Sequence, residues 1–203
     1  MSAKIVIVDF RMGNLHTVAR RFRSLGAEID VTRDPSVLSG SSHIVLPGVG
    51  HFGAAMTDLE DTGMASVIRE RVLDGHSRVL GICLGMQLLC DHSEEGDARG
   101  LGLIGCRVER LPAERGSRFR NPHVGWNTVK WRDGRCSDPT RRYYFAHSFA
   151  VRDVDADAAL ATASYGVQFA AAVQAPGALG YQFHPEKSRG PGLELLAAWL
   201  DGR

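Results

Sequence analysis

The sequence lacks long apolar runs, a strong net charge and an N-terminal segment with the features of a signal peptide. No stretch of about 18 apolar residues is present, so no transmembrane helix is expected. The N-terminal residues have none of the features of a signal peptide, which favours a cytoplasmic location. The 24 basic and 23 acidic residues leave a net charge of +1, so neither nucleic acid nor an anionic membrane is expected as a partner.

Cysteine is also scarce, with four residues in a chain of 203. Cys83, Cys90, Cys106 and Cys136 do not occur in pairs at metal-ligand spacing, and four cysteines in a chain of this length do not indicate a disulfide framework. We therefore expect cysteine to matter through the reactivity of a single residue. The sequence predicts no metal site and no other cofactor.

The composition is that of an ordinary globular protein, with 44% hydrophobic and 23% charged residues, and the length predicts one domain over residues 1–203. In the first half, short apolar runs alternate with segments of helical periodicity. We predict strands at 4–9, 29–32, 44–46 and 78–82, and helices at 15–25, 64–73 and 84–90. This alternation is typical of an α/β fold with a largely parallel central sheet flanked by helices.

The hydrophobic pattern of the second half is different, with several apolar runs joined by turns and little helical periodicity. We predict strands at 103–111, 129–131, 143–151, 159–163, 169–174 and 179–183, and a helix after Pro191. We expect these strands to form antiparallel additions to the sheet.

The segment Gly81-Ile82-Cys83-Leu84-Gly85 joins a predicted strand to a predicted helix. A nucleophile at such a junction, with a glycine two positions away on each side, is typical of a nucleophile elbow. Glycine is needed there because a Cβ would clash with the crossing helix and strand. A helix N-terminus also lowers the pKa of a thiol, and the Leu84 N–H could stabilise an oxyanion. The alternative is that Cys83 is a small buried hydrophobic residue.

A thiolate nucleophile needs a base, and the sequence offers His184 with Glu186 two residues later. In an extended chain both side chains point to the same side. Glu186 could then accept a hydrogen bond from one imidazole nitrogen and leave the other for the sulfur. The alternative is a surface histidine beside a solvated glutamate.

The glycine-rich segment at 47–50 follows the third predicted strand. Ligands bind at the carboxyl ends of parallel strands, so this segment and Cys83 should share one rim of the sheet. The alternatives are a plain turn and a phosphate-binding loop, although the Lys-Ser/Thr ending of such a loop is absent.

Five segments together resemble the class I glutamine amidotransferases: GICLGMQLL around Cys83, PGVG at 47–50, PHVGWN at 122–127, YFAHSF at 144–149 and QFHPEKS at 182–188. Within that family the pattern is most similar to the glutaminase subunits of imidazole glycerol phosphate synthases. The similarity extends from residue 4 to about residue 200. It implies a flavodoxin-like α/β fold and the hydrolysis of glutamine to glutamate and ammonia.

The resemblance also implies a role for each matching residue. Cys83 would attack the side-chain amide of glutamine, His184 would act as acid and base, and Glu186 would orient His184. The N–H groups of Val49 and Leu84 would form the oxyanion hole. Glutamine would be bound by Gly50, Gln87, Glu95, His147, Ser148 and Phe149, with Glu94 as an alternative to Glu95 for the substrate ammonium.

In this family the ammonia crosses an interface into a (β/α)8-barrel cyclase subunit, which makes imidazole glycerol phosphate and an aminoimidazole carboxamide ribotide in histidine biosynthesis. The resemblance therefore implies a heterodimer, with Asn14, Trp126 and Lys187 as candidates for the interface. Their alternative roles are a helix cap, an aromatic residue of the core or rim, and a solvated lysine.

Some positions depart from the family pattern. Arg11 replaces a small residue, Phe149 stands where tyrosine is common, and Gly180-Tyr181 precedes Gln182 where an aliphatic residue or threonine is common. Three other functions stay open. The chain could be a paralogue that supplies ammonia for surface-polysaccharide sugars, a catalytically silent binding subunit, or a cysteine peptidase of similar fold. Arg11 lies near the expected partner face, so this departure leaves open that the partner is the synthase of such a paralogue.

Overall fold

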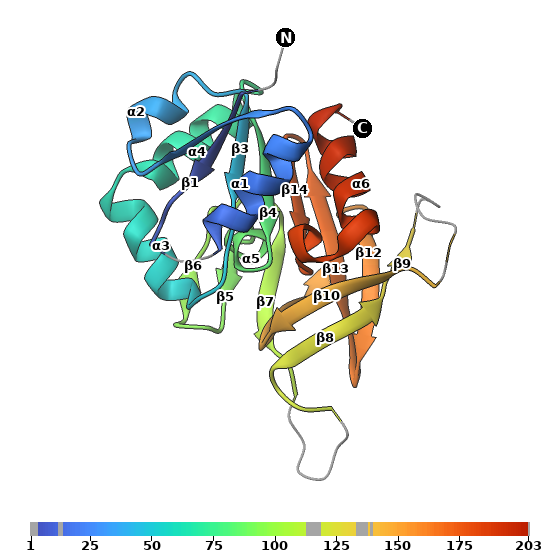
Figure 1. The fold of residues 1–203 in the computed structure, drawn as a ribbon. Coiled ribbons are helices and arrows are strands. Elements are labelled where there is room, and N and C mark those ends of the chain that lie inside the picture. The colour runs from blue at the N-terminus through green and yellow to red at the C-terminus, as the bar shows by residue number, and fades with distance from the viewer. Residues whose placement is uncertain (1–3, 12–13, 113–118, 133–137, 139, 203) are drawn as a thin grey trace.

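A computed structural model describes residues 4–11, 14–112, 119–132, 138 and 140–202. Its centre is an eight-stranded sheet in the order β2-β1-β3-β4-β14-β13-β12-β9 (Figure 1). The strands that pair in parallel are β2 (Glu28–Thr32), β1 (Lys4–Val8), β3 (His43–Leu46), β4 (Arg78–Ile82) and β14 (Ala178–Tyr181). Antiparallel pairing then adds β13 (Val167–Ala175), β12 (Ala159–Tyr165) and β9 (Lys130–Trp131).

Two smaller sheets complete the fold. One has four strands in the order β11-β7-β5-β6 and the other pairs β10 with β8. Their bounds are β5 (His92–Ser93), β6 (Ala98–Arg99), β7 (Cys106–Arg110), β8 (His123–Thr128), β10 (Arg142–His147) and β11 (Phe149–Val154). Figure 1 shows β8 and β10 at the end of the molecule opposite to the C-terminal end of the last helix.

Helices cover both faces of the central sheet (Figure 1). Alternate residues of β1 enter two separate cores. Val6 and Val8 belong to the core that also holds α2 (Pro35–Leu38), α3 (Phe52–Asp61), α4 (Met64–Leu73) and α5 (Leu84–Leu88). Ile5 and Ile7 belong to the core that holds α1 (Leu15–Ser24) and α6 (Arg189–Leu200). Because both of their faces are buried, β1, β3 and β4 are largely apolar runs in the sequence, whereas the edge strand β2 is partly exposed and carries charged residues.

The local sequence explains the ends of α1. The Asn14 side chain caps the helix by accepting a hydrogen bond from the Thr17 N–H at 3.2 Å. Gly26 follows the helix with a φ of 83°, the left-handed conformation that commonly ends helices. Between them, Val18, Ala19 and Phe22 form the buried stripe.

The predicted α/β fold, with a largely parallel sheet and antiparallel additions, is confirmed, and the helix predicted at 64–73 is α4. The single strand predicted at 143–151 is wrong. This segment forms β10 and β11, which belong to different sheets, with Ser148 between them. No glycine or proline stands at Ser148, so the apolar pattern of the sequence indicates one continuous strand. The sequence does not predict α2, α3 and β8, nor the short strands β5 and β6.

Cys90 and Cys106 form a disulfide that links the end of the α5 segment to β7. The expectation that cysteine matters only as a single reactive residue is therefore wrong for this pair. The two residues are 16 apart in the sequence, and their spacing does not reveal that the fold brings them together. Cys83 is free and buried. Cys136 lies outside the described residues.

None of the helices in the described part of the chain is long and apolar enough to cross a membrane. Within the same residues, no group of three or more His, Cys, Asp or Glu side chains is placed to hold a metal ion. A cytoplasmic location stays a prediction.

Candidate active site

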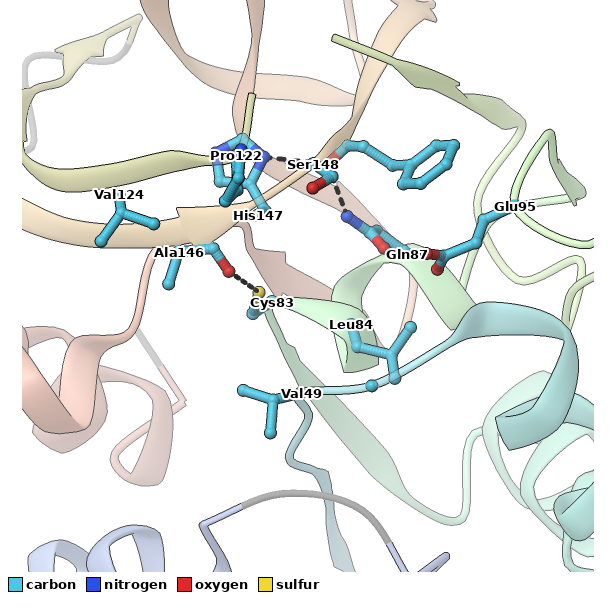
Figure 2. A pocket seen from close by; sticks show the side chains of 12 residues that line it. Val49, Cys83, Leu84, Gln87, Glu95, Pro122, Val124, Ala146, His147 and Ser148 are labelled. Atoms are coloured by element: carbon cyan, nitrogen blue, oxygen red, sulfur yellow. Dashed lines mark hydrogen bonds between the residues drawn. The ribbon is translucent and has the colours of Figure 1, made fainter. Parts of the chain in front are cut away.

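One cavity of about 320 Å³ lies at the carboxyl ends of β3 and β4 (Figure 2). It brings together nine of the residues predicted from the sequence: Val49, Gly50, Cys83, Leu84, Gln87, Glu95, His147, Ser148 and Phe149. Pro122, Val124 and Ala146 complete the lining. Segments that are far apart in the sequence therefore meet in one pocket, with the candidate nucleophile in its wall.

The backbone at Cys83 is a tight turn between β4 and α5. Its φ of 54° is unusual for a residue other than glycine, and such strain is held in place by the surrounding structure. A Cβ at Gly81 would run into the backbone of Gly85, and a Cβ at Gly85 would run into the carbonyl group of Leu46. The predicted need for glycine on both sides of the cysteine is confirmed.

The Cys83 thiol borders the hydrophobic core but contacts polar groups. Its sulfur lies 3.7 Å from the Ala146 carbonyl oxygen (Figure 2). It also lies 3.7 Å from the amide nitrogen of Gln182. The residue directly precedes α5, where the first helical N–H groups have no partner within the helix. Together with the strained turn, this environment favours a reactive thiol over a structural cysteine.

His184 and Glu186 form a buried pair, each side chain no more than 3% exposed. His184 Nδ1 lies 2.8 Å from Glu186 Oε1. The two residues meet through a turn of 3-10 helix, η1 (Pro185–Lys187), so the prediction of an extended segment is wrong although the predicted contact is present. A tight turn can bring side chains two residues apart into contact, as a strand can. The spacing of His184 and Glu186 alone therefore does not tell a turn from a strand.

The backbone around the pair is held from several sides. The His184 N–H donates to the Tyr144 carbonyl at 2.8 Å, and the Ser188 hydroxyl donates to the His184 carbonyl at 2.6 Å. From α1, Arg21 Nε donates to the Glu186 carbonyl at 3.0 Å. These contacts fix the direction of the imidazole ring.

His184 Nε2 has no hydrogen-bond partner among the described residues. Burial lowers the pKa of His184, but the negative charges of the Cys83 thiolate and of Glu186, 2.8 Å from Nδ1, outweigh burial and raise the pKa well above its usual value. At neutral pH a Cys83 thiolate therefore faces a protonated His184, which makes a thiolate–imidazolium pair.

The opposite wall of the pocket carries the predicted glutamine-binding residues. The Gln87 amide donates to the Phe149 carbonyl at 2.8 Å and to the Gln182 side-chain oxygen at 3.1 Å. Glu95 accepts from the Phe52 N–H at 2.8 Å, at the start of α3, and lines the cavity. Its neighbour Glu94 instead accepts from the Arg110 N–H and is not among the lining residues, so the geometry favours Glu95.

Sequence reasoning missed two residues next to the predicted site. Gln182 is fully buried and bridges Gln87 and Cys83, although it lies only two residues before His184. His123 is also buried and contacts His147 behind the pocket. Both lie in the segments that carry the family resemblance, but nothing in the sequence marks them as buried, and only their hydrogen bonds reveal their place beside the site.

Comparison with known sequences decides the family. A profile of the glutamine amidotransferase class-I family matches residues 6–200. The chain belongs to the class I glutamine amidotransferases. The predicted family is therefore confirmed.

Relatives match this amidotransferase over nearly its whole length. The imidazole glycerol phosphate synthase subunit HisH of Methanopyrus kandleri is 43% identical over 203 residues, covering 98% of both chains. The protein of the same name from Symbiobacterium thermophilum is 44% identical over 202 residues, covering 97% of this chain and 93% of its own. A crystal structure of a glutamine amidotransferase has a TM-score of 0.77 over 98% of this chain and 99% of its own, at 22% identity, and supports the fold.

The three predicted interface residues of the amidotransferase do not all lie on the same surface. Trp126 is 40% exposed and lies against Tyr144 and the Arg189 guanidinium. The Lys187 ammonium lies 5.5 Å from the centre of the Tyr144 ring. These two predicted residues therefore share one surface, whereas the side chain of Asn14 caps α1.

Proposed function

We propose that the chain is the glutaminase subunit of an imidazole glycerol phosphate synthase. The proposal is carried by one observation: the cysteine of a nucleophile elbow shares a pocket with eight other predicted site residues. The relatives named as subunits of that synthase supply the pathway. The chain would hydrolyse glutamine to glutamate and pass the ammonia to a synthase partner, as a single domain without a cofactor.

The first half of the proposed reaction forms a thioester. The Cys83 thiolate attacks the carbon of the glutamine side-chain amide, and the oxygen takes up negative charge. His184 holds a proton at Nε2 and gives it to the amide nitrogen as the carbon–nitrogen bond breaks. Ammonia leaves and the glutamyl group stays bonded to the sulfur. Glu186 stabilises the imidazolium and fixes its orientation through the 2.8 Å contact to Nδ1.

The second half releases glutamate. Neutral His184 takes a proton from water, and the resulting hydroxide attacks the thioester carbon. The carbon–sulfur bond breaks, glutamate leaves, and the thiolate–imidazolium pair is restored. In both halves the N–H groups of Leu84 and Val49 would stabilise the negative oxygen.

The backbone of the Val49 segment packs tightly on the elbow. A Cβ at Gly48 would come within 2.9 Å of the Gly85 nitrogen, so the segment after β3 that carries the Val49 N–H lies directly against α5. Val49 itself is 41% exposed, and Gly50 has a φ of 140° that only glycine adopts readily. A segment that is packed on one side and exposed on the other can be reoriented by a partner that covers it.

We further propose that the partner, a (β/α)8-barrel cyclase, binds the surface formed by Trp126, Tyr144, Lys187 and Arg189, here called the β8–β10 face. Val124, 57% exposed, lines the glutamine pocket from the same strand as Trp126. A partner on this face would therefore close the pocket. Closure is needed because ammonia in water at neutral pH is mostly protonated and no longer nucleophilic.

The competing functions fit less well. A peptidase does not require Gln87, Gln182 and Glu95 to be arranged in the pocket wall. A silent subunit does not require a buried His184–Glu186 pair with a free Nε2 atom. A paralogue that serves surface-polysaccharide synthesis would keep the same pocket, and only the identity of its partner would differ.

The test is release of glutamate from glutamine by the isolated chain and by its complex with a candidate cyclase and the cyclase's nucleotide ligand. We expect low activity alone and an increase of at least about tenfold in the complex, because the Val49 peptide must complete the oxyanion hole, and one oxyanion donor is worth about a hundredfold or more. Full activity of the isolated chain would contradict the role given to the partner.

Two surface variants test the face itself. Trp126→Ala should weaken co-purification with the cyclase and the stimulation of glutamate release. Leu73→Ala removes an even more exposed hydrophobic side chain, 73% accessible at the end of α4, and should change neither. Equal loss in both variants would show that the partner does not bind through the β8–β10 face.

A further inference from the structure

Behind the glutamine pocket lies a pair of buried histidines that the proposed reaction does not use. His123 is 3% exposed and does not line the cavity. Its ring is stacked against Tyr165, with centroids 4.0 Å apart, and against Phe145 at 4.9 Å. Its Nδ1 atom lies 3.0 Å from Nε2 of His147, which does line the cavity. The pair thus connects the interior of the protein to the pocket wall.

The hydrogen bonds fix the proton positions in this pair. His147 Nδ1 lies 2.8 Å from the Phe149 carbonyl, which can only accept, so His147 carries its proton on Nδ1. Burial lowers the pKa of His147 to about 3 and that of His123 to about 4, so both rings are neutral at pH 7. The Nε2 atom of His147 then has a lone pair and must accept from the Nδ1–H of His123.

The same bond direction extends back to β8. The Asn127 amide lies 3.4 Å from Nε2 of His123 and donates to it, while the Asn127 oxygen is occupied by the Thr128 N–H. A chain of bonds of one polarity therefore runs from β8 to the carbonyl of Phe149. The same carbonyl accepts a second bond from the Gln87 amide, which comes from the side of Cys83.

We propose that His123 is a positioning residue for the glutamine site: its Nδ1–H donates to Nε2 of His147 and so holds the His147 ring, and through it the peptide of Phe149, in the pocket wall. The inference rests on the proposed binding of glutamine in this cavity. Without the donor, His147 Nε2 becomes a buried acceptor with no partner, and the ring is held only by its bond to the Phe149 carbonyl. A shift of the ring towards another donor then displaces the Phe149 peptide.

Two substitutions separate the ring of His123 from its hydrogen bond. His123→Phe keeps an aromatic ring between Tyr165 and Phe145 but has no donor. His123→Asn loses the ring but places an amide N–H close to the position of Nδ1. In complex with the cyclase, His123→Phe should raise the KM for glutamine by roughly five- to twentyfold while kcat changes by less than about threefold. His123→Asn should restore much of the KM.

Two controls distinguish positioning from a general loss of structure. Ammonia-dependent synthesis by the His123→Phe complex should equal that of the wild type, because that reaction does not use the glutamine pocket. Tyr165→Phe keeps the stacked ring and removes only the hydroxyl that accepts from the Arg120 N–H, so its KM for glutamine should not change. An unchanged KM in His123→Phe, or a rise in Tyr165→Phe of the same size, overturns the proposal.

A measurement on the wild-type chain needs no variant. Nitrogen-15 NMR of the histidine side chains should show both rings neutral with the proton on Nδ1. A proton on Nε2 of His147 overturns the proposal even if the variants fail to fold. Glutamine hydrolysis by the wild-type complex tests the proposed function separately: absence of activity with a correct His147 tautomer contradicts that function, whereas normal activity with a wrong tautomer contradicts only this inference.

Discussion

The pKa values of the buried histidines are shifted in opposite directions by their surroundings. His184 faces a carboxylate and a thiol, and its pKa is raised. His123 and His147 face each other and aromatic rings, and burial lowers the pKa of both. The same residue type therefore serves as a proton carrier in one position and as a fixed neutral hydrogen-bonding group in the other.

The neutral pair predicts a pH dependence of stability. Because their pKa values are lowered in the folded state, His123 and His147 bind fewer protons there than in the unfolded chain, whose histidines titrate near about pH 6.5. Their contribution is complete above that pH and is lost as the pH falls towards the values of about 4 and about 3. Each group lowers the free energy of unfolding by up to about 1.4 kcal/mol per pH unit in this window.

Urea unfolding at pH 7, 6 and 5 measures this slope. His123→Phe should show a shallower slope than the wild type, because one of the two groups is gone. The comparison between variants is needed because His184, with a raised pKa, contributes with the opposite sign. A slope that is identical in both proteins would show that His123 does not titrate with folding.

At the scale of elements, the elbow depends on how closely α5 approaches β3 and β4. Gly85→Ala places a Cβ against the Leu46 carbonyl, a backbone group that cannot move without disturbing β3. We expect a loss of stability of about 3 kcal/mol and of most glutaminase activity, because overpacking against backbone displaces the helix that carries Cys83. Gly40→Ala is the control, since a Cβ there meets nothing within 4 Å. Equal thermal stability of the two variants would refute the tight packing of the elbow.

The Cys90–Cys106 disulfide gives a second prediction at this scale. It closes a loop of 16 residues between the α5 segment and β7, for which the chain-entropy account gives about 3 kcal/mol of stabilisation. Reduction should lower the stability of the wild type by roughly this amount and should not affect Cys106→Ala. Peptide mapping without reductant must recover Cys90 linked to Cys106. Disulfides are rare in reducing compartments, so a fully reduced pair in protein taken from the cytoplasm would limit this contribution to oxidising conditions.

Elements with a strong local signal could be predicted from the sequence, and contacts across the fold could not. The helix from Met64 to Leu73 and the elbow at Cys83 follow from periodicity and glycine spacing. The break at Ser148 and the disulfide depend on which strands become neighbours, and no short window contains that information. For the site, the family motifs located the pocket residues, whereas His123 and Gln182 became visible only through their hydrogen bonds.

At the scale of the whole molecule, the structure separates two tasks. The pocket at the carboxyl ends of β3 and β4 is lined by Cys83 and the proposed glutamine-binding residues, and the β8–β10 face presents aromatic and basic side chains beside it. Val124 contributes to the pocket from the same strand as Trp126. The proposed division is that this chain generates ammonia and its partner consumes it, so the two reactions can be measured independently.

The most direct test of the account replaces the nucleophile in the complete complex. Cys83→Ala, bound to the cyclase, should lose glutamine-dependent synthesis by at least about a thousandfold, because the sulfur that forms the thioester is absent. Synthesis from added ammonium salt should stay at the wild-type rate, because the partner and the β8–β10 face are unchanged. Retention of the glutamine-dependent reaction, or loss of both reactions in a folded complex, would contradict the claim that Cys83 is the nucleophile.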